Sequence, residues 1–374
     1  MMTNDRPLKI LVVDDTILYR TIITDVLSEL SGVTVVGTAR NGKVAIHRIA
    51  ILEPDILILD IEMPEMDGLE VLEWIRDNTP DVGAFIISSF AKKDGEMTVK
   101  ALNLGAFDFI QKTDFNNNSM EANKKALKET IKPMLEAYAK RREVREILKG
   151  KLSLSTPESE SKILRDYNDA VRHMGTVSSP HSSIIAIATS TGGPEALMKI
   201  LPDIPENINV PLLIVQHMPS VFTQFITSGL NKKCAIEVRA AVDGEPVMPN
   251  RAIFAPGGKQ MKVEKSADGK IFIIRVTDDR PENNCKPSAD YLFRSIAHHY
   301  GKHATGVIMT GMGTDGMLGL KMMKRNGAII IAQNEETCTV FGMPKEPIRL
   351  GIVDVIAPLE RIAEEICRTV KIKR

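Results

Sequence analysis

The stretch LKILVVDD, residues 8–15, decides the fold of the first part of the chain. Residues 9–13 form a short, largely apolar strand that two carboxylates follow at once, and residues 16–30 then show a helical pattern with one apolar face. Further apolar strands at residues 33–36, 56–59, 84–87 and 107–110 repeat this alternation of strand and helix. Strands that are apolar on both faces and alternate with helices indicate a parallel sheet covered on both sides. A doubly wound α/β domain is therefore predicted for residues 1–113.

The same alternation returns from residue 183 onward. Apolar strands are predicted at residues 184–189, 212–215, 236–238, 306–310, 328–332 and 352–355. Three further strands lie between these, at residues 252–255, 261–264 and 271–276, and the last two flank Ala267-Asp268-Gly269, a sequence typical of hairpin turns. Residues 183–374 are therefore predicted to form a second doubly wound α/β domain, with a mostly parallel sheet and a small antiparallel hairpin.

Residues 114–182 differ from both regions in composition. Leu127 and Ile131 fall on one face of a helical pattern, which Pro133 is expected to kink or interrupt. A charged stretch over residues 140–151 follows, and then segments rich in Ser, Pro and Gly, as is typical of linkers. We interpret residues 114–182 as a partly helical, charged and Ser-rich linker, whose apolar stripe fits a surface helix docked on one domain.

Composition excludes several classes of protein. Lys plus Arg and Asp plus Glu both total 48, and residues 181–374 hold 24 basic against 20 acidic residues, which is too even for a DNA-binding output domain. No apolar run approaches the roughly 18 residues of a membrane span, and the N-terminus does not resemble a signal peptide. The four cysteines lie far apart without C-x-x-C spacing. We therefore expect a reduced cytoplasmic protein without disulfides, nucleic-acid binding or membrane insertion.

Charged and polar side chains follow the strands of the first domain. Asp14 and Asp15 follow the first strand and Asp60 follows the third, so all three should meet at the carboxyl edge of the sheet. Three neighbouring carboxylates repel one another and favour a bound cation, and oxygen-only ligation suits Mg²⁺. Ser88 and Lys112 end the next two strands, where they would neutralise a phosphoryl group placed on Asp60. Turn or helix-cap roles would explain one such Asp but not the whole set.

These residues lie in motifs that resemble the receiver domain of two-component response regulators. The motifs are LVVDD (11–15), LDIEMPEMDGLE (59–70), IISSF (86–90) and LGAFDFIQK (104–112). The resemblance implies a flavodoxin-like fold and phosphorylation of Asp60 by a partner histidine kinase. It further implies that Asp14, Asp15, Asp60 and the backbone carbonyl of Glu62 hold Mg²⁺, and it places Phe109 at the family's aromatic switch position. One departure is Thr113, which stands where the family usually has Pro.

A second site is indicated by SSIIAIATSTGGPEALMKIL, residues 182–201, which predicts a strand, a tight turn and a helix. Ser190 ends the strand, Gly192 and Gly193 permit a close turn, and Pro194 suits an early helix position. The layout is that of a nucleophile elbow without the G-x-S-x-G motif. From these residues alone, a phosphate-binding turn or a simple helix cap remains open.

A serine nucleophile needs a base, and the base needs an orienting acid. His217 follows the next strand and Asp315 lies in a Gly-rich turn after another strand, so the topology can bring both to Ser190. The backbone N–H groups around Met312 are candidates for an oxyanion hole. Taken one at a time, each residue also has a purely structural explanation: His217 as a buried histidine at a strand end, and Asp315 as a turn former. The pair His299 and His303 has metal-ligand spacing, but a solvated helix face is the favoured explanation.

The second domain resembles the catalytic domain of chemotaxis protein-glutamate methylesterases (CheB-type). Matching segments include ATSTGGPEAL (188–197), IVQHMPSVFT (214–223), AVDGEPVMPNRAIFAPGG (241–258), KPSADYLFRSIA (286–297) and VIMTGMGTDGMLGL (307–320). The resemblance implies that Ser190 is the nucleophile, His217 the base and Asp315 the orienting acid. It also implies that Thr191 hydrogen-bonds the histidine and that Met312 donates its backbone N–H to the oxyanion. Ala188 and Gln260 depart from the family pattern, which usually has Gly and His there.

The implied reaction is hydrolysis of glutamyl methyl esters, and deamidation of certain glutamines, on methyl-accepting chemotaxis receptors. The hydrolase chemistry itself needs no cofactor. In this family the receiver covers the catalytic face until it is phosphorylated, so phosphorylation of Asp60 is expected to activate the enzyme. The alternative is a catalytically silent module that binds receptors or a kinase.

Overall fold

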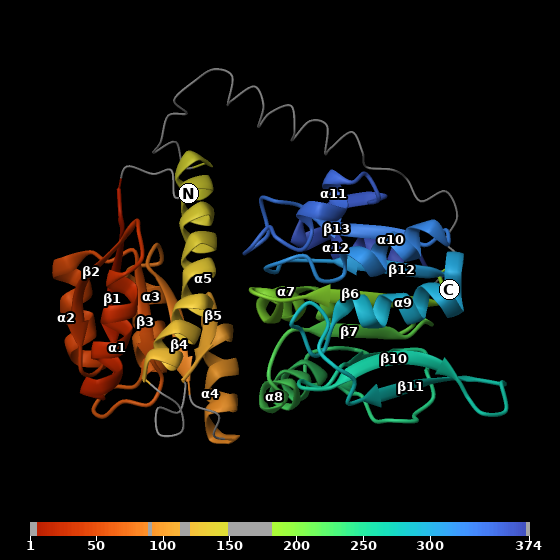
Figure 1. Ribbon diagram of the computed structural model, residues 1–374, viewed down its shortest axis with the longest axis horizontal. Coiled ribbons are helices and arrows are strands. Elements are labelled where there is room, and N and C mark those ends of the chain that lie inside the picture. Colours follow the sequence, from red (N-terminus) through yellow and green to blue (C-terminus); the bar gives the residue numbers. More distant parts are fainter. Residues whose placement is uncertain (1–5, 89–91, 113–119, 149–181, 372–374) are drawn as a thin grey trace, which may run out of the picture. The chain divides into compact units, whose positions relative to one another are not determined.

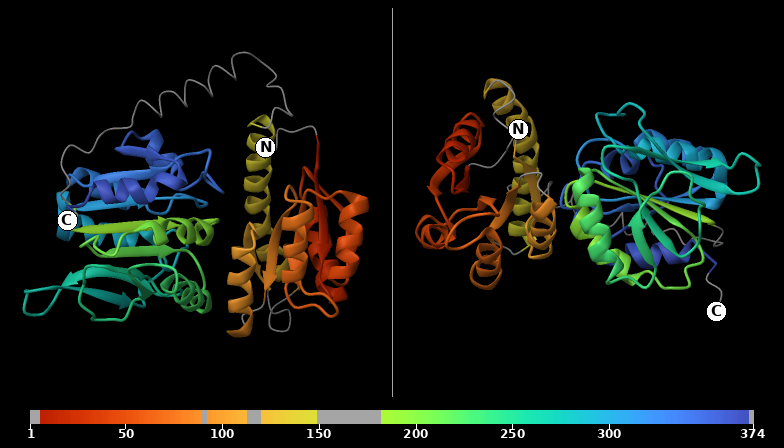
Figure 2. Two further views of the ribbon diagram at one scale, coloured as in Figure 1. Left: turned by 180° about the vertical axis from the view of Figure 1, so that it is seen from behind. Right: turned by 90° about the horizontal axis from the view of Figure 1, so that it is seen from below.

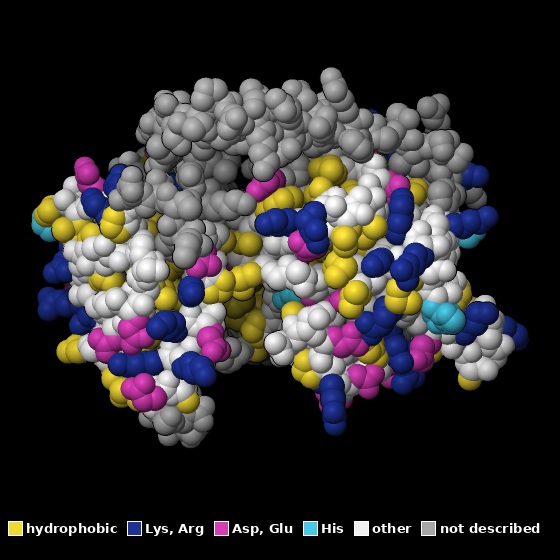
Figure 3. Space-filling model, turned by 45° about the horizontal axis from the view of Figure 1, so that its top comes forward, with side chains coloured by type: hydrophobic (Ala, Val, Ile, Leu, Met, Phe, Trp, Pro, Cys, Tyr) yellow, Lys and Arg dark blue, Asp and Glu magenta, His cyan; other side chains and the backbone are white. Residues whose placement is uncertain are grey.

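The computed structural model describes residues 6–88, 92–112, 120–148 and 182–371. The chain divides into two compact units, Met1–Arg142 and Glu143–Arg374, and each is described by itself (Figure 1). No helix among the described residues is both long enough and apolar enough to span a bilayer. On the face drawn in Figure 3, basic and acidic side chains are interspersed, as the zero net charge leads one to expect.

The first unit is a five-stranded parallel sheet in the order β2-β1-β3-β4-β5. Its strands are β1 (Leu8–Val13), β2 (Val33–Ala39), β3 (Ile56–Asp60), β4 (Gly83–Ser88) and β5 (Asp108–Gln111). Its helices are α1 (Ile17–Ser28), α2 (Gly42–Leu52), α3 (Gly68–Asn78), α4 (Lys92–Asn103) and α5 (Met120–Leu148). Every residue of β3 and all but one of β1 are buried, as expected for strands that are covered on both faces. The predicted doubly wound fold is confirmed.

Helix α5, which follows the predicted domain boundary at residue 113, packs onto the first unit, as expected for a helix with an apolar stripe that docks on one domain. Its apolar stripe, from Leu127 to Tyr138, packs into the same core as Phe85 and Phe107, and the Tyr138 hydroxyl donates to the Asp55 backbone oxygen at 2.8 Å. The helix also continues through Pro133, where a kink or an interruption was expected. The stripe is thus a core face of the first unit, and the charged residues around it are its solvent side. The rest of the predicted linker, residues 149–181, lies outside the described residues.

The second unit is built on a seven-stranded parallel sheet in the order β14-β13-β12-β6-β7-β9-β8. Its strands are β6 (Ile184–Thr189), β7 (Leu212–Gln216), β8 (Glu237–Ala240), β9 (Arg251–Phe254), β12 (Ala304–Ile308), β13 (Ile329–Gln333) and β14 (Val355–Ala357). The separate pair β10 (Gln260–Lys265) and β11 (Phe272–Thr277) is antiparallel, as predicted. Helices cover both faces of the large sheet (Figure 2). They are α7 (Gly193–Ile200), α8 (Ser220–Asn231), α9 (Ala289–Tyr300), α10 (Met317–Arg325), α11 (Lys345–Arg349) and α12 (Leu359–Arg368), with 3₁₀ turns η1 (Leu201–Asp203) and η2 (Gly301–His303).

Strand β6 lies at the centre of this sheet, paired with β7 on one side and with β12 on the other. The chain therefore leaves β6 toward one side and later returns to the other, so β6 marks a topological switch point. Ligand sites in open parallel sheets form at the carboxyl ends of strands beside such a point. The segments that follow β6, β7 and β12 contain Ser190, His217 and Asp315.

Candidate functional site

The carboxyl edge of the first sheet brings together the predicted charged residues. Lys112 Nζ lies 2.7 Å from Asp60 Oδ2 and 3.0 Å from Asp14 Oδ2. Asp14 and Asp60 are buried and Asp15 is exposed, and carboxylate oxygens of all three lie within 4.8 Å of one another. The predicted juxtaposition of Asp14, Asp15, Asp60 and Lys112 is present in the structure.

Burial and like charge control the ionisation of this cluster. Burial raises the pKa of Asp60 to about 7, and the nearby carboxylates of Asp14 and Asp15 act in the same direction, while Lys112 opposes them. Burial works against the charge of Lys112, but its two carboxylate partners outweigh this and raise its pKa. Asp60 is thus poised between its neutral and charged forms near neutral pH, and any added cation would favour the charged form.

The remaining residues predicted for this site lie around the cluster. Ser88 ends β4 and is buried; its hydroxyl accepts a hydrogen bond from Thr98 Oγ1 at 2.9 Å, and its backbone oxygen accepts one from the Lys112 N–H at 2.8 Å. Phe109 is half-buried on β5, and Glu62 is exposed in the loop after β3. Sequence reasoning missed Thr98, because a threonine inside a helical pattern gives no sign of its partner. Thr113 lies outside the described residues.

The turn between β6 and α7 places Ser190. Gly192 has a φ of 75°, in the left-handed region that favours glycine, and caps the helix. At Gly193 a Cβ atom would lie 1.7 Å from Thr189 Oγ1 and 2.0 Å from Gln216 Oε1, so no side chain fits there. The Ser190 backbone oxygen accepts a hydrogen bond from the Gly193 N–H at 2.8 Å. The two glycines therefore permit a tight turn that presents Ser190 at the end of β6.

Gln216, the last residue of β7, holds the backbones of the serine and the histidine. Its Nε2 donates to the Ser190 oxygen at 2.9 Å and to the His217 oxygen at 3.1 Å, while Thr189 Oγ1 donates to its Oε1. Gln216 is buried, so these bonds are shielded from water. Sequence reasoning missed this residue because its partners are backbone atoms that only the folded sheet brings together.

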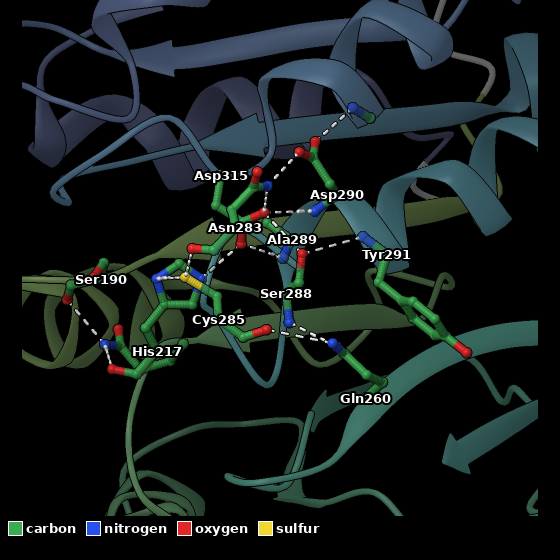
Figure 4. A network of polar contacts seen from close by, with 12 residues as sticks. Ser190, His217, Gln260, Asn283, Cys285, Ser288, Ala289, Asp290, Tyr291 and Asp315 are labelled. Atoms are coloured by element: carbon green, nitrogen blue, oxygen red, sulfur yellow. Dashed lines mark hydrogen bonds and ion pairs between the residues drawn. The ribbon is translucent and has the colours of Figure 1, made fainter. Parts of the chain in front are cut away.

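His217 and Asp315 form an ion pair, with Nε2 of the ring 2.8 Å from Asp315 Oδ2. The carboxylate also accepts hydrogen bonds from the Ser288 hydroxyl at 2.8 Å and the Asn283 side-chain amide at 3.0 Å. Two backbone N–H groups at the start of α9, those of Ala289 and Asp290, complete its contacts at 2.7 and 3.2 Å (Figure 4). Asp315 is thus fixed at a helix N-terminus, where negative charge is favoured.

The ionisation of this pair follows from its contacts. Burial opposes the charge of Asp315, but the hydrogen bonds from His217 and from the α9 terminus outweigh it and lower its pKa to about 2. Burial likewise opposes the charge of His217, yet the bond to Asp315 and the Cys285 thiol beside the ring raise its pKa to about 9. Because Nε2 is hydrogen-bonded to Asp315, Nδ1 is the ring nitrogen that can exchange a proton with a nucleophile or a substrate.

Ser190 lies beside His217, but among the described residues their side chains share no hydrogen bond. Such contacts between nucleophile and base are often loose before substrate binds. The Gly311–Met312 backbone adjoins the serine, since a Cβ atom on Gly311 would lie 2.8 Å from Ser190 Cβ and 3.0 Å from its nitrogen. The Thr191 backbone oxygen accepts a bond from Thr310 Oγ1 at 2.9 Å, and no bond from Thr191 to His217 is present among these residues. Its predicted role therefore stays a prediction.

The structure also places Gln260 and the pair His299 and His303, which the sequence singled out. Gln260 is buried; its Oε1 accepts from the Ser288 N–H at 2.8 Å and its Nε2 donates to the Cys285 oxygen at 3.3 Å, so it supports the loop around Asp315.

The pair His299 and His303 is separated by the end of a helix. Helix α9 ends at Tyr300, which leaves His303 in a 3₁₀ turn, and the His299 ring lies 5.5 Å from that of Phe272. The two histidines thus do not share a helix face.

Comparison with known proteins identifies both halves of the chain. Residues 10–123 match the response regulator receiver domain, and residues 185–366 match the CheB methylesterase domain. A protein of Desulfotalea psychrophila named protein-glutamate methylesterase/protein-glutamine glutaminase is 46% identical over 98% of this chain and 99% of its own length. The chain belongs to the CheB methylesterase family.

Other members of this CheB family extend the comparison. A Bacillus subtilis protein with the same name as the Desulfotalea relative is 36% identical over 98% of this chain and 99% of its own. The crystal structure of the Thermotoga maritima CheB methylesterase catalytic domain is 35% identical; it covers 50% of this chain and 99% of its own, with a TM-score of 0.49. The two matched family domains, residues 10–123 and 185–366, fall within the two units described above.

Proposed function

We propose that this chain is a protein-glutamate methylesterase and protein-glutamine glutaminase whose receiver domain controls hydrolysis. The observation that carries the proposal is the pairing of His217 with Asp315 at 2.8 Å beside a serine that Gln216 holds in place. A serine, a histidine and an aspartate in this relation form the machinery of acyl transfer, whatever their order along the chain.

The proposed chemistry begins with His217 Nδ1 taking the proton of the Ser190 hydroxyl. The serine oxygen attacks the ester carbonyl of a methylated glutamate, and the backbone N–H of Met312 stabilises the oxyanion. Collapse of the tetrahedral species returns the proton to the leaving group and releases methanol when that group is the methoxy oxygen of an ester, or ammonia when it is the nitrogen of a glutamine amide. Water, deprotonated by the same histidine, then attacks the acyl-enzyme and frees the glutamate and Ser190. Asp315 stabilises the imidazolium in both steps.

In the first unit, Asp60 is the proposed phosphorylation site. Its carboxylate attacks a phosphoryl group held by a donor histidine, and the Lys112 ammonium and the Ser88 hydroxyl bind the transferred oxygens. Phosphorylation of Asp60 is proposed to shift the Phe109 side chain. This shift favours the state in which the receiver no longer inhibits the hydrolase domain. The raised pKa of Asp60 fits a buried carboxylate beside two others, whose negative charge a bound cation would stabilise.

The donor set of this site fits Mg²⁺. Asp14, Asp15 and Asp60 provide an all-oxygen cluster with ligand atoms within 4.8 Å, and hard cations prefer such ligands. Receiver domains as a class depend on Mg²⁺ for phosphorylation, and we propose that these carboxylates and the Glu62 backbone carbonyl hold it. When bound, the cation supplies charge neutralisation for the phosphoryl oxygens. We propose no cofactor for the hydrolase chemistry.

The proposed partners follow from the two reactions. The hydrolase acts on methyl-accepting chemotaxis receptors, and a histidine kinase of the chemotaxis type provides the phosphoryl group. The widely spaced cysteines suit a reducing compartment, so we place the protein in the cytoplasm.

The experiment that tests this function measures methanol release from methylated receptor membranes, with and without a small phosphodonor and Mg²⁺. Release that rises with the phosphodonor supports both sites and their coupling. Release without stimulation supports the hydrolase and contradicts the control by the receiver. Absence of release from the folded protein would favour a catalytically silent binding module instead.

Ser190→Ala is the matched control. Loss of the nucleophile should lower the rate by on the order of 10⁴-fold or more. Near-normal release by this variant would exclude Ser190 as the nucleophile.

A further inference from the structure

We propose that His217 and Cys285 form a binding site for a divalent metal ion of the zinc class, and that an ion bound there stops hydrolysis reversibly. The ion binding stands on the geometry of these two side chains alone. The inhibition rests on the proposed function of His217 as the base.

The two ligand atoms already lie at the right separation. Cys285 Sγ is 3.8 Å from His217 Nδ1 (Figure 4). A tetrahedral Zn²⁺ with bonds of about 2.3 Å to sulfur and about 2.0 Å to nitrogen holds those atoms about 3.5 Å apart. Insertion of the ion therefore needs a movement of only a few tenths of an ångström.

The far side of the ring is arranged as in histidine metal ligands. Asp315 engages Nε2 at 2.8 Å, which fixes the ring and leaves Nδ1 as the coordinating nitrogen. Metal-bound histidines commonly have such a carboxylate on their second nitrogen, which orients the ring and makes it a better ligand. Asp315 is itself held by its bonds to Ser288 and α9, so the imidazole is already oriented for coordination.

The loop that bears the cysteine is also held in place. Glu282 and Cys285 exchange backbone hydrogen bonds at 2.7 and 3.1 Å, and Gln260 Nε2 donates to the Cys285 oxygen at 3.3 Å. Cys285 is partly exposed, and besides its contact with His217 the thiol donates only a weak hydrogen bond to the Asn283 backbone oxygen at 3.4 Å among the described residues. On binding, the thiol proton and the proton that the imidazolium form carries on Nδ1 both go to solvent; the sulfur then coordinates the ion as a thiolate, Nδ1 coordinates it as a neutral imidazole nitrogen, and water fills the remaining positions.

The other cysteines provide internal controls. Burial raises the pKa of the Cys234 thiol to about 11, and burial also raises the pKa of Cys338 and Cys367. Among the described residues, two groups of three side chains have ligand atoms close enough to hold a metal ion. One contains His217 and Cys285 together with Asp315, and the other is the all-oxygen set of Asp14, Asp15 and Asp60. Hard oxygen ligands suit Mg²⁺, so excess Mg²⁺ can occupy that set without competing for a thiolate.

The consequence for catalysis is direct. An ion on Nδ1 occupies the nitrogen that is proposed to take the Ser190 proton, so the base is blocked while the ion stays bound. Removal of the ion by a chelator restores the free nitrogen, which makes the inhibition reversible.

The test uses the full chain in excess Mg²⁺ and two measurements. The first is titration with Co²⁺, a spectroscopic substitute for Zn²⁺, in which a thiolate ligand gives a near-ultraviolet charge-transfer band. The second is Zn²⁺ inhibition of methanol release, expressed relative to the metal-free rate of each variant. We expect the wild type to show the band and to be inhibited, with activity restored by chelator.

Cys285→Ser should abolish the band and weaken Zn²⁺ inhibition by on the order of tenfold or more. Cys234→Ser is the matched control and should behave as the wild type. Ser190→Ala should keep the band, because the serine is not a ligand, and a band in this variant supports the site even if the proposed hydrolase activity fails. Absence of the band from the wild type, or equal Zn²⁺ sensitivity of Cys285→Ser and the wild type, would overturn the proposal.

Discussion

The Gln216 side-chain amide donates to the Ser190 backbone oxygen across 2.9 Å, which ties the end of β7 to the turn after β6. The same amide reaches the His217 oxygen at 3.1 Å. One buried side chain thereby sets the spacing between the proposed nucleophile and the proposed base.

This contact predicts the behaviour of Gln216→Glu. The variant keeps an oxygen for Thr189 but loses both amide donor bonds, so the serine and histidine backbones lose their common support. We expect kcat for methyl ester hydrolysis to fall by about 100-fold, as for small misplacements of catalytic groups, with much less change in KM. Steady-state kinetics beside a thermal melt measure this. A variant that loses activity only in proportion to lost folded protein would contradict a positioning role.

The pH dependence of hydrolysis should follow His217. The base acts when neutral, and its pKa is raised to about 9, so kcat/KM should increase about tenfold per pH unit below that value and level off above it. Asp315→Asn removes the negative partner, so the plateau should move to lower pH while kcat falls by on the order of 10⁴-fold, as in other Ser-His-Asp triads. Rate profiles of both proteins across pH 6–10 provide the measurement. An unchanged shape of the pH profile in the variant would argue against His217, paired with Asp315, as the base.

Phosphorylation should depend on pH through Asp60. The carboxylate attacks in its charged form, and its pKa is raised to about 7, so phosphate incorporation from a small donor should increase as pH rises through 7 in low Mg²⁺. Added Mg²⁺ favours the charged form and should move this rise to lower pH. Mass spectrometry of the intact protein follows the added phosphate. Asp60→Asn should take up none, and uptake by that variant would point to another acceptor.

Gly311 is predicted to be intolerant of even one methyl group. A Cβ atom there would lie 2.4 Å from Met343 Sδ and 2.8 Å from Ser190 Cβ, so Gly311→Ala must displace the serine or its neighbours. We expect a loss of about 100-fold in kcat and about 1–3 kcal/mol in the free energy of unfolding.

The matched control is Gly229→Ala. That glycine lies within α8, and a Cβ atom there meets nothing within 4 Å. Its replacement should change activity little and stabilise the helix by up to about 1 kcal/mol. Equal kinetics for the two variants would show that the contact between Gly311 and Ser190 is unimportant.

Most strands of both sheets, and the polar residues that end them, could be predicted from the sequence; the last strand, predicted at residues 352–355, lies instead at Val355–Ala357. Parallel buried strands leave a strong apolar signal, and residues such as Asp60 and His217 stand out directly after it. The apolar stripe of α5 predicts a helix docked on one domain, but which domain it packs on, and its continuation through Pro133, could not be predicted, because both depend on core contacts that leave no local pattern. The partners that fix the site, Gln216 and Asn283, are set by tertiary contacts that leave no local pattern.

The five hydrogen-bond donors gathered on Asp315 have a practical consequence for anyone who needs an inactive form of this enzyme. Replacing Asp315 would leave several buried donors without an acceptor and loosen the segments they belong to. The Ser190 side chain makes no comparable bonds among the described residues, so its removal costs the fold little. Ser190→Ala is therefore the better choice for capturing a receptor in a stalled complex, since it should remain a well-folded copy of the native surface.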